Sequence, residues 1–312
     1  MDMLIKSNVD KKKVIILGGN GFIGKNLSKC CYKHGLDVYS LDIREPDEEL
    51  EGINYISGDF FDEIFLKEII SDKDIIFHAI STIQPGNSNQ KYMSGYNRDM
   101  IESIRLFSYL LGTKKKLIFL SSGGTVYGNQ PIKEDVMALP INHYGNVKLC
   151  IENTMRVFNT QMHSKMLIAR ISNPYGPGQD FNKGVGFIDA AIKKAMLGDV
   201  LEIWGNGDTV RDYIYIDDVC EMLYSLIDYS GEEEVFNISS GIGTSQNDII
   251  NIVEDKIRKI NIIYKDRRSV DVNKIILDNS KISNVCDIKL ISLENGIEKT
   301  IDHLKKYQNI WK

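Results

Sequence analysis

A tyrosine and a lysine four residues apart could act together in proton transfer. Tyr144 and Lys148 lie in a stretch with helical periodicity, so we expect them on one face of a helix. A phenol has a pKa of about 10, and a nearby ammonium group favours the phenolate and lowers that pKa. Tyr144 could then take a proton from a hydroxyl group while hydride leaves the adjacent carbon. Such pairs also occur by chance on helix surfaces, so this pair alone does not define a site.

Hydroxyl groups follow an apolar run upstream of this pair. Residues 117–128 read LIFLSSGGTVYG, so a predicted strand ends at Ser121 and Ser122, and a glycine turn leads to Thr125. Parallel sheets bind ligands beyond the carboxyl ends of their strands, where a hydroxyl could hold an oxygen atom opposite Tyr144. Ordinary turn formation would also explain the two serines, and Thr125 could be a buried residue bonded to its own backbone.

A glycine-rich turn near the start of the chain is typical of a dinucleotide site. Residues 14–24 read VIILGGNGFIG, in which a strand precedes Gly18, Gly21 and Gly24 and a helix follows. The first glycine permits a tight turn, the second lets the backbone approach a pyrophosphate, and the third lets helix and strand pack closely. The first N–H groups of the helix then face the phosphates.

An acidic residue follows this turn at the spacing of a ribose-binding group. Asp42 ends the second predicted strand, within the ~20 residues expected after the glycines. A carboxylate there accepts hydrogen bonds from both ribose hydroxyls and repels a 2′-phosphate, which favours NAD over NADP. Asp42 could instead initiate a loop or cap a helix, and nearby Arg44 weakly favours NADP.

Alternating strands and helices must position these residues. We expect a Rossmann-type, doubly wound parallel sheet of the α/β class with a smaller C-terminal substrate-binding lobe. The nucleotide-binding core should comprise residues 1–173, with 217–240 returning to it, and the lobe should comprise 174–216 and 241–312. Predicted strands cover 14–17, 38–43, 54–57, 75–80, 117–120, 166–171 and 235–238, and predicted helices include 22–34, 62–70, 97–111 and 143–161.

Composition argues against several other classes of protein. With 38 basic and 43 acidic side chains the formal net charge is -5, which makes nucleic acid a poor partner. The five cysteines show no CxxC spacing, so we expect neither a disulfide framework nor a metal site. The polar start is unlike a signal peptide, and no apolar run is long enough to cross a membrane. We therefore expect a cytoplasmic protein with reduced thiols.

The chain resembles the extended short-chain dehydrogenase/reductase family in four features that follow one another in this order: GGNGFIG, Asp42, SSGGTVYG and YGNVK. More narrowly, the chain is similar to the NAD-dependent nucleotide-sugar epimerase/dehydratase branch, and especially to UDP-hexose 4-epimerases. The resemblance covers nearly the whole chain. Later segments that carry it are GDF (58–60), FHAISTIQP (77–85), RISNPYGPGQ (170–179), EIWGNGDTVRDYIYIDDV (202–219) and RRSVD (267–271).

The resemblance implies NAD as the cofactor and a nucleotide-diphosphate sugar as the substrate. Its substrate residues would be Asn173 and Arg211 at the phosphates, Trp204 near the base, Arg268 and Asp271 at the diphosphate and ribose, and Val185 and Tyr213. Its cofactor residues would be Gly18, Gly21, Phe22, Ile23, Gly24, Asp42, Ile43, Asp59, Phe60, Ala79, Ile80, Ser81, Asn97, Tyr144 and Lys148.

The catalytic hydroxyl departs from the commonest family pattern. Many members place Ser or Thr where this chain has Gly123, whereas relatives with Thr-Gly-Gly carry the active hydroxyl one residue earlier. That second pattern implies Ser122 as the catalytic hydroxyl beside Tyr144 and Lys148, with Thr125 as the alternative.

The segment around Gly123 also bears on the reaction. Dehydratases of this branch carry an Asp-Glu pair there, which this chain lacks, so we expect 4-epimerisation of a sugar such as UDP-glucose or UDP-N-acetylglucosamine. The alternatives are a reductase of a nucleotide 4-keto-6-deoxysugar and, in another class, a non-catalytic NAD-sensing protein. Relatives commonly form homodimers through two helices, which here would be 97–111 and 143–161.

Overall fold

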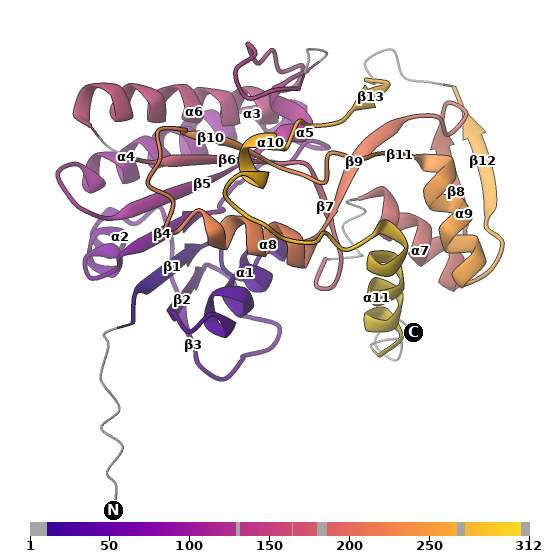
Figure 1. Ribbon diagram of the computed structural model, residues 1–312, viewed down its shortest axis with the longest axis horizontal. Helices are drawn as coiled ribbons and strands as arrows, with labels where there is room; N and C mark the ends of the chain where they lie inside the picture. Colours follow the sequence, from indigo (N-terminus) through magenta and orange to yellow (C-terminus); the bar gives the residue numbers. More distant parts are fainter. Residues whose placement is uncertain (1–10, 129–131, 164, 180–185, 267–271, 307–312) are drawn as a thin grey trace, which may run out of the picture.

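Apolar, β-branched runs form the centre of the molecule. The computed structural model describes residues 11–128, 132–163, 165–179, 186–266 and 272–306. Its main strands are β1 (Lys13–Leu17), β2 (Asp37–Asp42), β3 (Ile53–Ser57), β4 (Ile75–His78), β5 (Lys116–Ser122), β6 (Leu167–Ile171) and β10 (Val235–Ile238). They form one seven-stranded sheet in the order β10-β6-β5-β4-β1-β2-β3, with all neighbours parallel (Figure 1). The predicted Rossmann-type sheet is confirmed, and its order reverses between β1 and β4, where such sheets bind ligands.

Helices cover both faces of this sheet because alternate strand residues point to opposite sides. Ile15 and Leu17 of β1 pack with α2 (Glu63–Ile70), α4 (Ile101–Leu110) and α6 (His143–Met162). Val14 and Ile16 pack on the other side with α1 (Phe22–Lys33) and α8 (Ile216–Ser225). Figure 1 shows α6 and α8 on opposite sides of the central strands.

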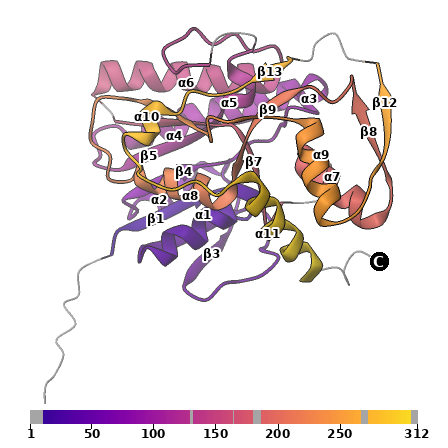
Figure 2. The same cartoon turned by 45° about the vertical axis from the view of Figure 1, so that its right-hand side comes forward.

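The remaining elements gather beyond one end of the sheet (Figure 2). Strand β9 pairs with β7, β11 and β13, while β8 pairs with β12. The elements concerned are β7 (Asn173–Tyr175), α7 (Phe187–Leu197), β8 (Val200–Trp204), β9 (Val210–Tyr215), β11 (Gly243–Ser245), α9 (Gln246–Lys256), β12 (Asn261–Lys265), β13 (Lys274–Ile275) and α11 (Leu293–Lys306), whereas α10 (Ser280–Ser283) lies beside β10. Strand β10 joins the sheet edge within the segment expected to return to the core, and the exact division into core and lobe stays a prediction.

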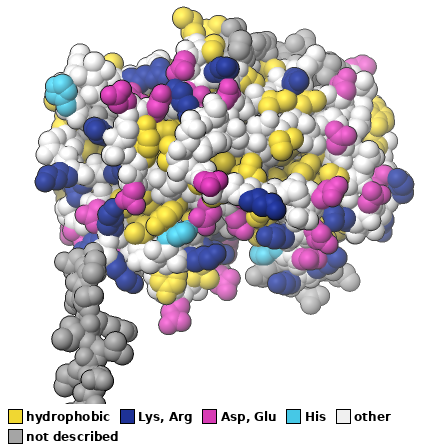
Figure 3. Space-filling model, in the orientation of Figure 1, with side chains coloured by type: hydrophobic (Ala, Val, Ile, Leu, Met, Phe, Trp, Pro, Cys, Tyr) yellow, Lys and Arg dark blue, Asp and Glu magenta, His cyan; other side chains and the backbone are white. Residues whose placement is uncertain are grey.

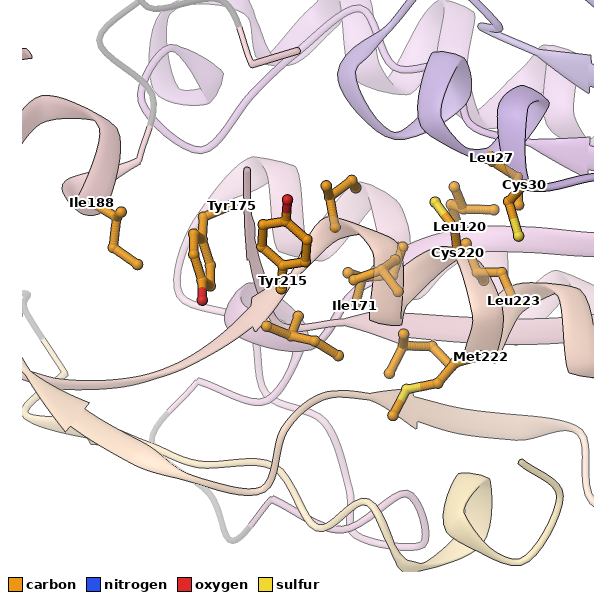
Figure 4. Packing of buried hydrophobic residues seen from close by; sticks show 14 of the residues in the cluster. Leu27, Cys30, Leu120, Ile171, Tyr175, Ile188, Tyr215, Cys220, Met222 and Leu223 are labelled. Carbon is orange, nitrogen blue, oxygen red and sulfur yellow. The ribbon is translucent and has the colours of Figure 1, made fainter. Parts of the chain in front are cut away.

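A continuous apolar cluster joins this second group of elements to the sheet. The rings of Tyr175 and Tyr215 meet edge to face, with centroids 5.6 Å apart. Figure 4 shows them between Ile188 of α7 and Ile171 of β6, from which the cluster continues toward α8 and α1. The second group of elements therefore shares the hydrophobic core of the sheet.

The helical segment before β5 begins earlier than expected. We predicted a helix over 97–111, but α3 (Ser88–Ser94) leads into a π-helical turn, η1 (Gly95–Met100), and then into α4. A π-helical turn holds an extra residue and changes which side chains face inward. Gly95 allows the turn to lie close to its neighbours, because a Cβ atom there would be 2.4 Å from Cδ1 of Ile83.

Charged side chains of both signs are interspersed over the face shown in Figure 3. In the part of the chain that the structure describes, no helix combines the length and the apolar character needed to cross a membrane.

A buried ion pair joins β5, α6 and β6. The guanidinium group of Arg170 donates two hydrogen bonds to Oε2 of Glu152, at 2.6 and 3.1 Å, and both side chains are almost fully buried. Ser121 of β5 donates to the other carboxylate oxygen of Glu152 at 2.5 Å. The Arg170 guanidinium also lies over the ring of Tyr127, 4.8 Å from its centroid. These contacts fix the helix that carries Tyr144 and Lys148 against the strand that ends at Ser122.

Removing one partner of this pair should destabilise the protein strongly. We expect Glu152→Ala to lower the free energy of unfolding by about 3–5 kcal/mol, because Arg170 would remain buried without its counter-charge. The double variant Glu152→Leu/Arg170→Met should lose less, since no buried charge remains. Urea denaturation checks both, with Glu63→Ala, which breaks the exposed pair with Lys67, as the control. If Glu152→Ala were as stable as the Glu63→Ala control, the prediction would be contradicted.

Candidate active site

The glycine turn has the shape that a pyrophosphate requires. Gly18 adopts a φ of 86°, and the N–H groups of Gly18 and Gly19 donate to the carbonyl of Leu41 at 2.8 and 2.9 Å. A Cβ atom at Gly24 would lie 2.2 Å from the carbonyl oxygen of Gly18, so only glycine lets α1 approach β1 this closely. Helix α1 begins at Phe22 with Gly21 as its N-cap and no side-chain cap. Its first N–H groups can therefore bind phosphate oxygens.

Asp42 lies at the carboxyl end of β2, next to this turn. Its carboxylate accepts hydrogen bonds from the backbone N–H groups of Asn20, at 3.2 Å, and Arg44, at 3.1 Å. The exposed guanidinium group of Arg44 also contacts Asp42, at 3.4 Å, while the neighbouring Ile43 is exposed. The carboxylate is thus held in place, and Arg44 is drawn toward it.

Residues after β4 border the same turn. A Cβ atom at Gly18 would lie 3.2 Å from the carbonyl carbon of Ala79 and 3.3 Å from Cγ1 of Ile80. Phe60 is buried against the ring of His78, and Asp59 accepts a hydrogen bond from the backbone of Phe61 at 3.0 Å. The structure therefore brings Ala79 and Ile80 to the glycine turn, as the resemblance implied.

The π-helical turn brings Asp99 to this edge, and Asn97 is exposed. Asp99 is buried and accepts hydrogen bonds from the hydroxyl of Ser81, at 2.8 Å, and from the backbone N–H of Thr82, at 2.8 and 3.0 Å. The expectation that Asn97 opens a helix here is wrong, because helix begins nine residues earlier, at Ser88. The sequence analysis missed Asp99, since a π-helical turn leaves no clear signal in the hydrophobic pattern.

Tyr144, Ser122 and Lys148 come together at the end of β5. Tyr144 lies in the first turn of α6, where the side chain of Asn142 caps the helix by accepting from the N–H of Gly145 at 2.8 Å. The side chain of Ser122 lies close enough to the phenol of Tyr144 to lower its pKa. Lys148, one turn along α6, is buried and donates to the carbonyl of Leu120 at 3.1 Å.

The charges around Tyr144 differ from those expected. Burial, together with the charge of Asp99, raises the pKa of Tyr144 to about 12, and the nearby Ser122 side chain opposes this shift. Burial also lowers the pKa of Lys148 to about 8, against the opposing charges of Asp99 and Glu152. Our expectation that Lys148 lowers the pKa of Tyr144 is therefore wrong for the protein alone. The Lys148 ammonium lies 5.8 Å from the centre of the Tyr144 ring, and desolvation outweighs its attraction.

Two glycines allow this close arrangement. A Cβ atom at Gly145 would lie 2.4 Å from the carbonyl oxygen of Thr125, so glycine lets the first turn of α6 rest on that segment. A Cβ atom at Gly123 would lie 2.5 Å from Cδ1 of Leu277, which takes the space of a side chain there. The Thr125 hydroxyl oxygen is buried and lacks a partner in the part of the chain described. Of the two predicted hydroxyls, Ser122 is therefore the one whose side chain lowers the pKa of Tyr144.

Apart from the groups around Tyr144, a cavity of about 230 Å³ lies between β7, α7, β9 and α9. Asn173 lines it and donates from its amide to the backbone carbonyl of Asp212 at 2.8 Å. The Asp212 carboxylate accepts from the backbone N–H groups of Ser240 and Gly241 at 3.0 Å, which fixes β9. The residues that line the cavity are Asn173, Pro174, Tyr175, Gly186, Phe187, Ile188, Asp189, Thr209, Arg211, Tyr213 and Gln246.

Three of the predicted substrate residues meet in this cavity, namely Asn173, Arg211 and Tyr213. Trp204, the last residue of β8, does not line the cavity. The ammonium nitrogen of Lys265 on β12 lies over its ring, 5.3 Å from the ring centre. The remaining predicted substrate residues, Val185, Arg268 and Asp271, lie outside the described residues. The sequence analysis singled out neither Asp189, which lies outside the identified motifs, nor Asp212, which lies within the segment 202–219.

One group of possible metal ligands lies away from this site. Cys30 and His34, one turn apart on α1, face Glu221 of α8, and Nε2 of His34 is 2.9 Å from the Glu221 carboxylate. The ring of His34 stacks on Tyr224 with centroids 3.9 Å apart. This contact links the two helices that cover one face of the sheet.

Asp42 should control the affinity for NAD. We expect Asp42→Ala to weaken NAD binding about tenfold or more, because hydrogen bonds between ribose hydroxyls and a charged acceptor would be lost. The same change should narrow the preference for NAD over NADP. Calorimetry with both dinucleotides checks this, and Asp47→Ala, at an exposed position of the same loop, is the control. Equal NAD affinities for Asp42→Ala and wild type would remove Asp42 from the site.

Asp99 should hold the lysine in its charged form. Because its charge raises the pKa of Lys148, Asp99→Asn should move the titration of Lys148 to lower pH than the wild-type value of about 8. Carbon-13 NMR of the lysine Cε atoms measures this directly, and Lys148→Arg identifies the signal. Asp72→Asn, beside Lys13 and Lys73, should leave that signal unchanged. A titration of Lys148 that does not respond to Asp99→Asn would contradict the placement of Asp99.

The comparisons with known proteins agree with this geometry. Residues 14–239 match the model of the NAD dependent epimerase/dehydratase family. The dTDP-4-dehydro-6-deoxyglucose reductase of Escherichia coli is 31% identical over 310 residues, which cover 95% of this chain and 98% of the relative. The GDP-6-deoxy-D-talose 4-dehydrogenase of Aggregatibacter actinomycetemcomitans is 28% identical, covering 88% of this chain and 90% of the relative.

A solved structure of UDP-glucose 4-epimerase from Thermotoga maritima, with UDP-glucose, has a TM-score of 0.87 and 28% identity, covering 95% of this chain and 99% of that one. The predicted resemblance is confirmed, and so is NAD as the cofactor, because the family model spans the glycine turn, Asp42 and the Tyr144 helix. This chain therefore belongs to the NAD dependent epimerase/dehydratase family of the extended short-chain dehydrogenase/reductases.

Proposed function

We propose that this protein moves hydride to and from C4 of a nucleotide-diphosphate sugar, and that the net reaction is 4-epimerisation. The observation that carries this proposal is the placement of Tyr144 and the buried Lys148 one turn apart on α6, beside the end of β5 that carries Ser122. Ser122, Tyr144 and Lys148 lie at the carboxyl edge of the sheet. There β5 pairs with β4, and the residues after β4 border the glycine turn. A sugar oxygen placed between the two hydroxyls would meet both a proton acceptor and a hydrogen-bond donor.

Each side chain has a distinct task in this reaction. Tyr144 takes the proton of the C4 hydroxyl as hydride leaves C4, and a 4-ketosugar forms. Ser122 holds the same oxygen, and Lys148 supplies positive charge behind the ring while it remains protonated, below pH 8 or so. NAD, when bound, accepts and returns the hydride, and its oxidised ring adds the positive charge that favours the phenolate. After the ketosugar rotates, hydride returns to its other face and Tyr144 gives the proton back.

The serine segment supports epimerisation over dehydration. Elimination of water needs a further acid and base near C5 and C6, and residues 123–125 contain only glycine and threonine. The space beside Gly123 is filled by Leu277, which cannot transfer a proton. Epimerisation needs only the groups already present around Tyr144.

A second candidate is reduction of a nucleotide 4-keto-6-deoxysugar. The reductase from Escherichia coli, at 31% identity, favours it. The raised pKa of Tyr144 also favours it, because a phenol that stays protonated can donate to a ketone oxygen as hydride arrives. The same groups would act, but the cofactor would leave oxidised after each turnover.

The first experiment separates the two net reactions. Purified protein is incubated with UDP-glucose or UDP-N-acetylglucosamine without added cofactor, and the products are analysed by NMR. Formation of the galacto isomers supports the epimerase. No conversion, together with NADH consumption when a dTDP-4-keto-6-deoxyhexose is supplied, supports the reductase. Failure of both reactions would contradict the proposal and favour an NAD-sensing protein.

Tyr144→Phe tests the role of the phenol in either reaction. We expect turnover to fall ~10²-fold or more, because a general acid–base group is lost, while bound NAD is retained. Tyr264→Phe, at an exposed position of β12, is the matched control and should behave like wild type. Wild-type turnover in Tyr144→Phe would exclude Tyr144 as the proton-transfer group.

We further infer a homodimer that buries the outer surfaces of α4 and α6, as the resemblance implied. Ile101 of α4 and Val157 of α6 are large apolar side chains exposed in the single chain, which supports this assembly. Sedimentation at several protein concentrations measures the oligomeric state, and charged substitutions at these two positions should shift it toward monomer.

A further inference from the structure

Three side chains that can bind a metal ion meet between α1 and α8. Cys30 lies in the last turn of α1, His34 caps the end of that helix, and Glu221 of α8 faces both. One ligand atom of each residue lies within 4.8 Å of the other two. A thiolate, an imidazole and a carboxylate bound to Zn²⁺ at ~2.0–2.3 Å lie about 3.3–3.7 Å apart in a tetrahedron. A movement of about 1 Å or less therefore brings all three around one ion.

The imidazole of His34 is already oriented toward this position. Its ring stacks on that of Tyr224, with centroids 3.9 Å apart and an angle of 13° between the planes. Its Nε2 atom lies 2.9 Å from a carboxylate oxygen of Glu221, one turn before Tyr224 on α8. Figure 4 shows Cys30 on the side of α1 that faces Cys220 of α8. The packing of the two helices thus holds the three ligands on facing surfaces.

The group is open to solvent on one side. The side chains of His34 and Glu221 are 35% and 34% exposed, whereas Cys30 is 8% exposed. An ion can enter between the two outer ligands and reach the sulfur at the inner end. The exposed side leaves a fourth position for a water molecule, as in zinc sites with three protein ligands.

The charges around the group favour a cation. Glu221 shares the first half of α8 with Asp217 and Asp218, and burial together with the charges of Asp217 and Glu221 raises the pKa of Asp218. Burial and the charge of Glu221 also raise the pKa of the Cys30 thiol, and Lys33 opposes this shift only weakly as the last of its causes. A divalent cation supplies the missing positive charge, and a thiol that coordinates it loses its proton.

The mixture of ligands selects the kind of metal. Thiolate and imidazole ligands suit Zn²⁺, whereas Mg²⁺ and Ca²⁺ require oxygen atoms. Cysteine spacing could not indicate this group, because it contains one cysteine and because His34 and Glu221 are 187 positions apart in the sequence. The fold alone brings them together.

We propose that Cys30, His34 and Glu221 form a zinc site that links α1 to α8, with water as the fourth ligand. The inference does not depend on the proposed function, because none of the three residues belongs to the groups around Tyr144 or to the cavity that Asn173 lines. Cys30 lies about 13 Å along α1 from its N-cap, so zinc and NAD can be bound at the same time.

Titration with Co²⁺ tests this proposal by spectroscopy. Metal-free protein without a polyhistidine tag should bind one equivalent of Co²⁺. It should then show the visible absorption of a tetrahedral cobalt ion and the near-ultraviolet charge-transfer band of a cobalt–thiolate bond. Zn²⁺ should remove both bands by displacing the cobalt, whereas Mg²⁺ and Ca²⁺ should not, because they avoid thiolate ligands.

Substitutions assign the ligands. Cys30→Ser should abolish the charge-transfer band, because the thiolate is lost. His34→Gln and Glu221→Gln should weaken Co²⁺ binding tenfold or more, since changes outside the ligand shell already cost about 10- to 100-fold in metal affinity. Cys150→Ser, at a partly exposed thiol on α6, is the matched control and should keep the wild-type spectrum. Circular dichroism of each metal-free variant shows that it is folded.

Thermal unfolding gives a second readout. Zn²⁺ at about 100 times its Kd should raise the Tm of wild type by about 3 °C or more, because the ion binds the folded chain. The shift should be absent in Cys30→Ser and present in Cys150→Ser. Two results would overturn the proposal: no charge-transfer band in wild type with one equivalent of Co²⁺, or the same band in Cys30→Ser. If Cys30→Ser does not fold, unchanged Co²⁺ affinity in both His34→Gln and Glu221→Gln would overturn it equally.

Discussion

The ion pair between Glu152 and Arg170 links the three elements on which the site depends. Strand β5 ends in Ser122, α6 carries Tyr144 and Lys148, and β6 continues toward Asn173. Each element contributes one member of the buried network, because Ser121 bonds to the same carboxylate as Arg170. A network this deeply buried tolerates little displacement, since any separation leaves a charge without a partner. The distance between the hydroxyl of Ser122 and the phenol is therefore set by contacts that lie behind both groups.

Much of the fold and of the arrangement around Tyr144 could be predicted because both depend on local patterns. Apolar runs identified the parallel strands, and glycine spacing identified the turn after β1. Helix α6 runs from His143 to Met162, within one residue of the expected end. Tyr144 and Lys148 follow from their spacing on that helix, and Ser122 follows from its position at the end of a strand. Each of these signals lies within a few residues of the side chain that it places.

The features that could not be predicted depend on contacts between distant segments. Asp99 faces inward because a π-helical turn changes the register of its helix, and Asn97 is exposed for the same reason. Asp189 differs from other acids in the first turn of a helix only because its surroundings exclude water. The pKa of Tyr144 also went against expectation, because burial outweighs a lysine that is itself desolvated. Neither burial nor register is visible in the types and spacing of residues alone.

The cavity that Asn173 and Arg211 line is built from β7, α7, β9 and α9, whereas the proposed proton-transfer group lies on β5 and α6. Strand β7 follows directly after β6, and Leu277, whose N–H bonds to Asp212 of β9, lies against Gly123. Such a division would let a lineage change the lining of this cavity by exchanging a few side chains on α7, while the groups around Tyr144 stay untouched. The same modularity offers protein engineers a route to new sugar nucleotides, in which α7 is redesigned and the groups around Tyr144 are inherited.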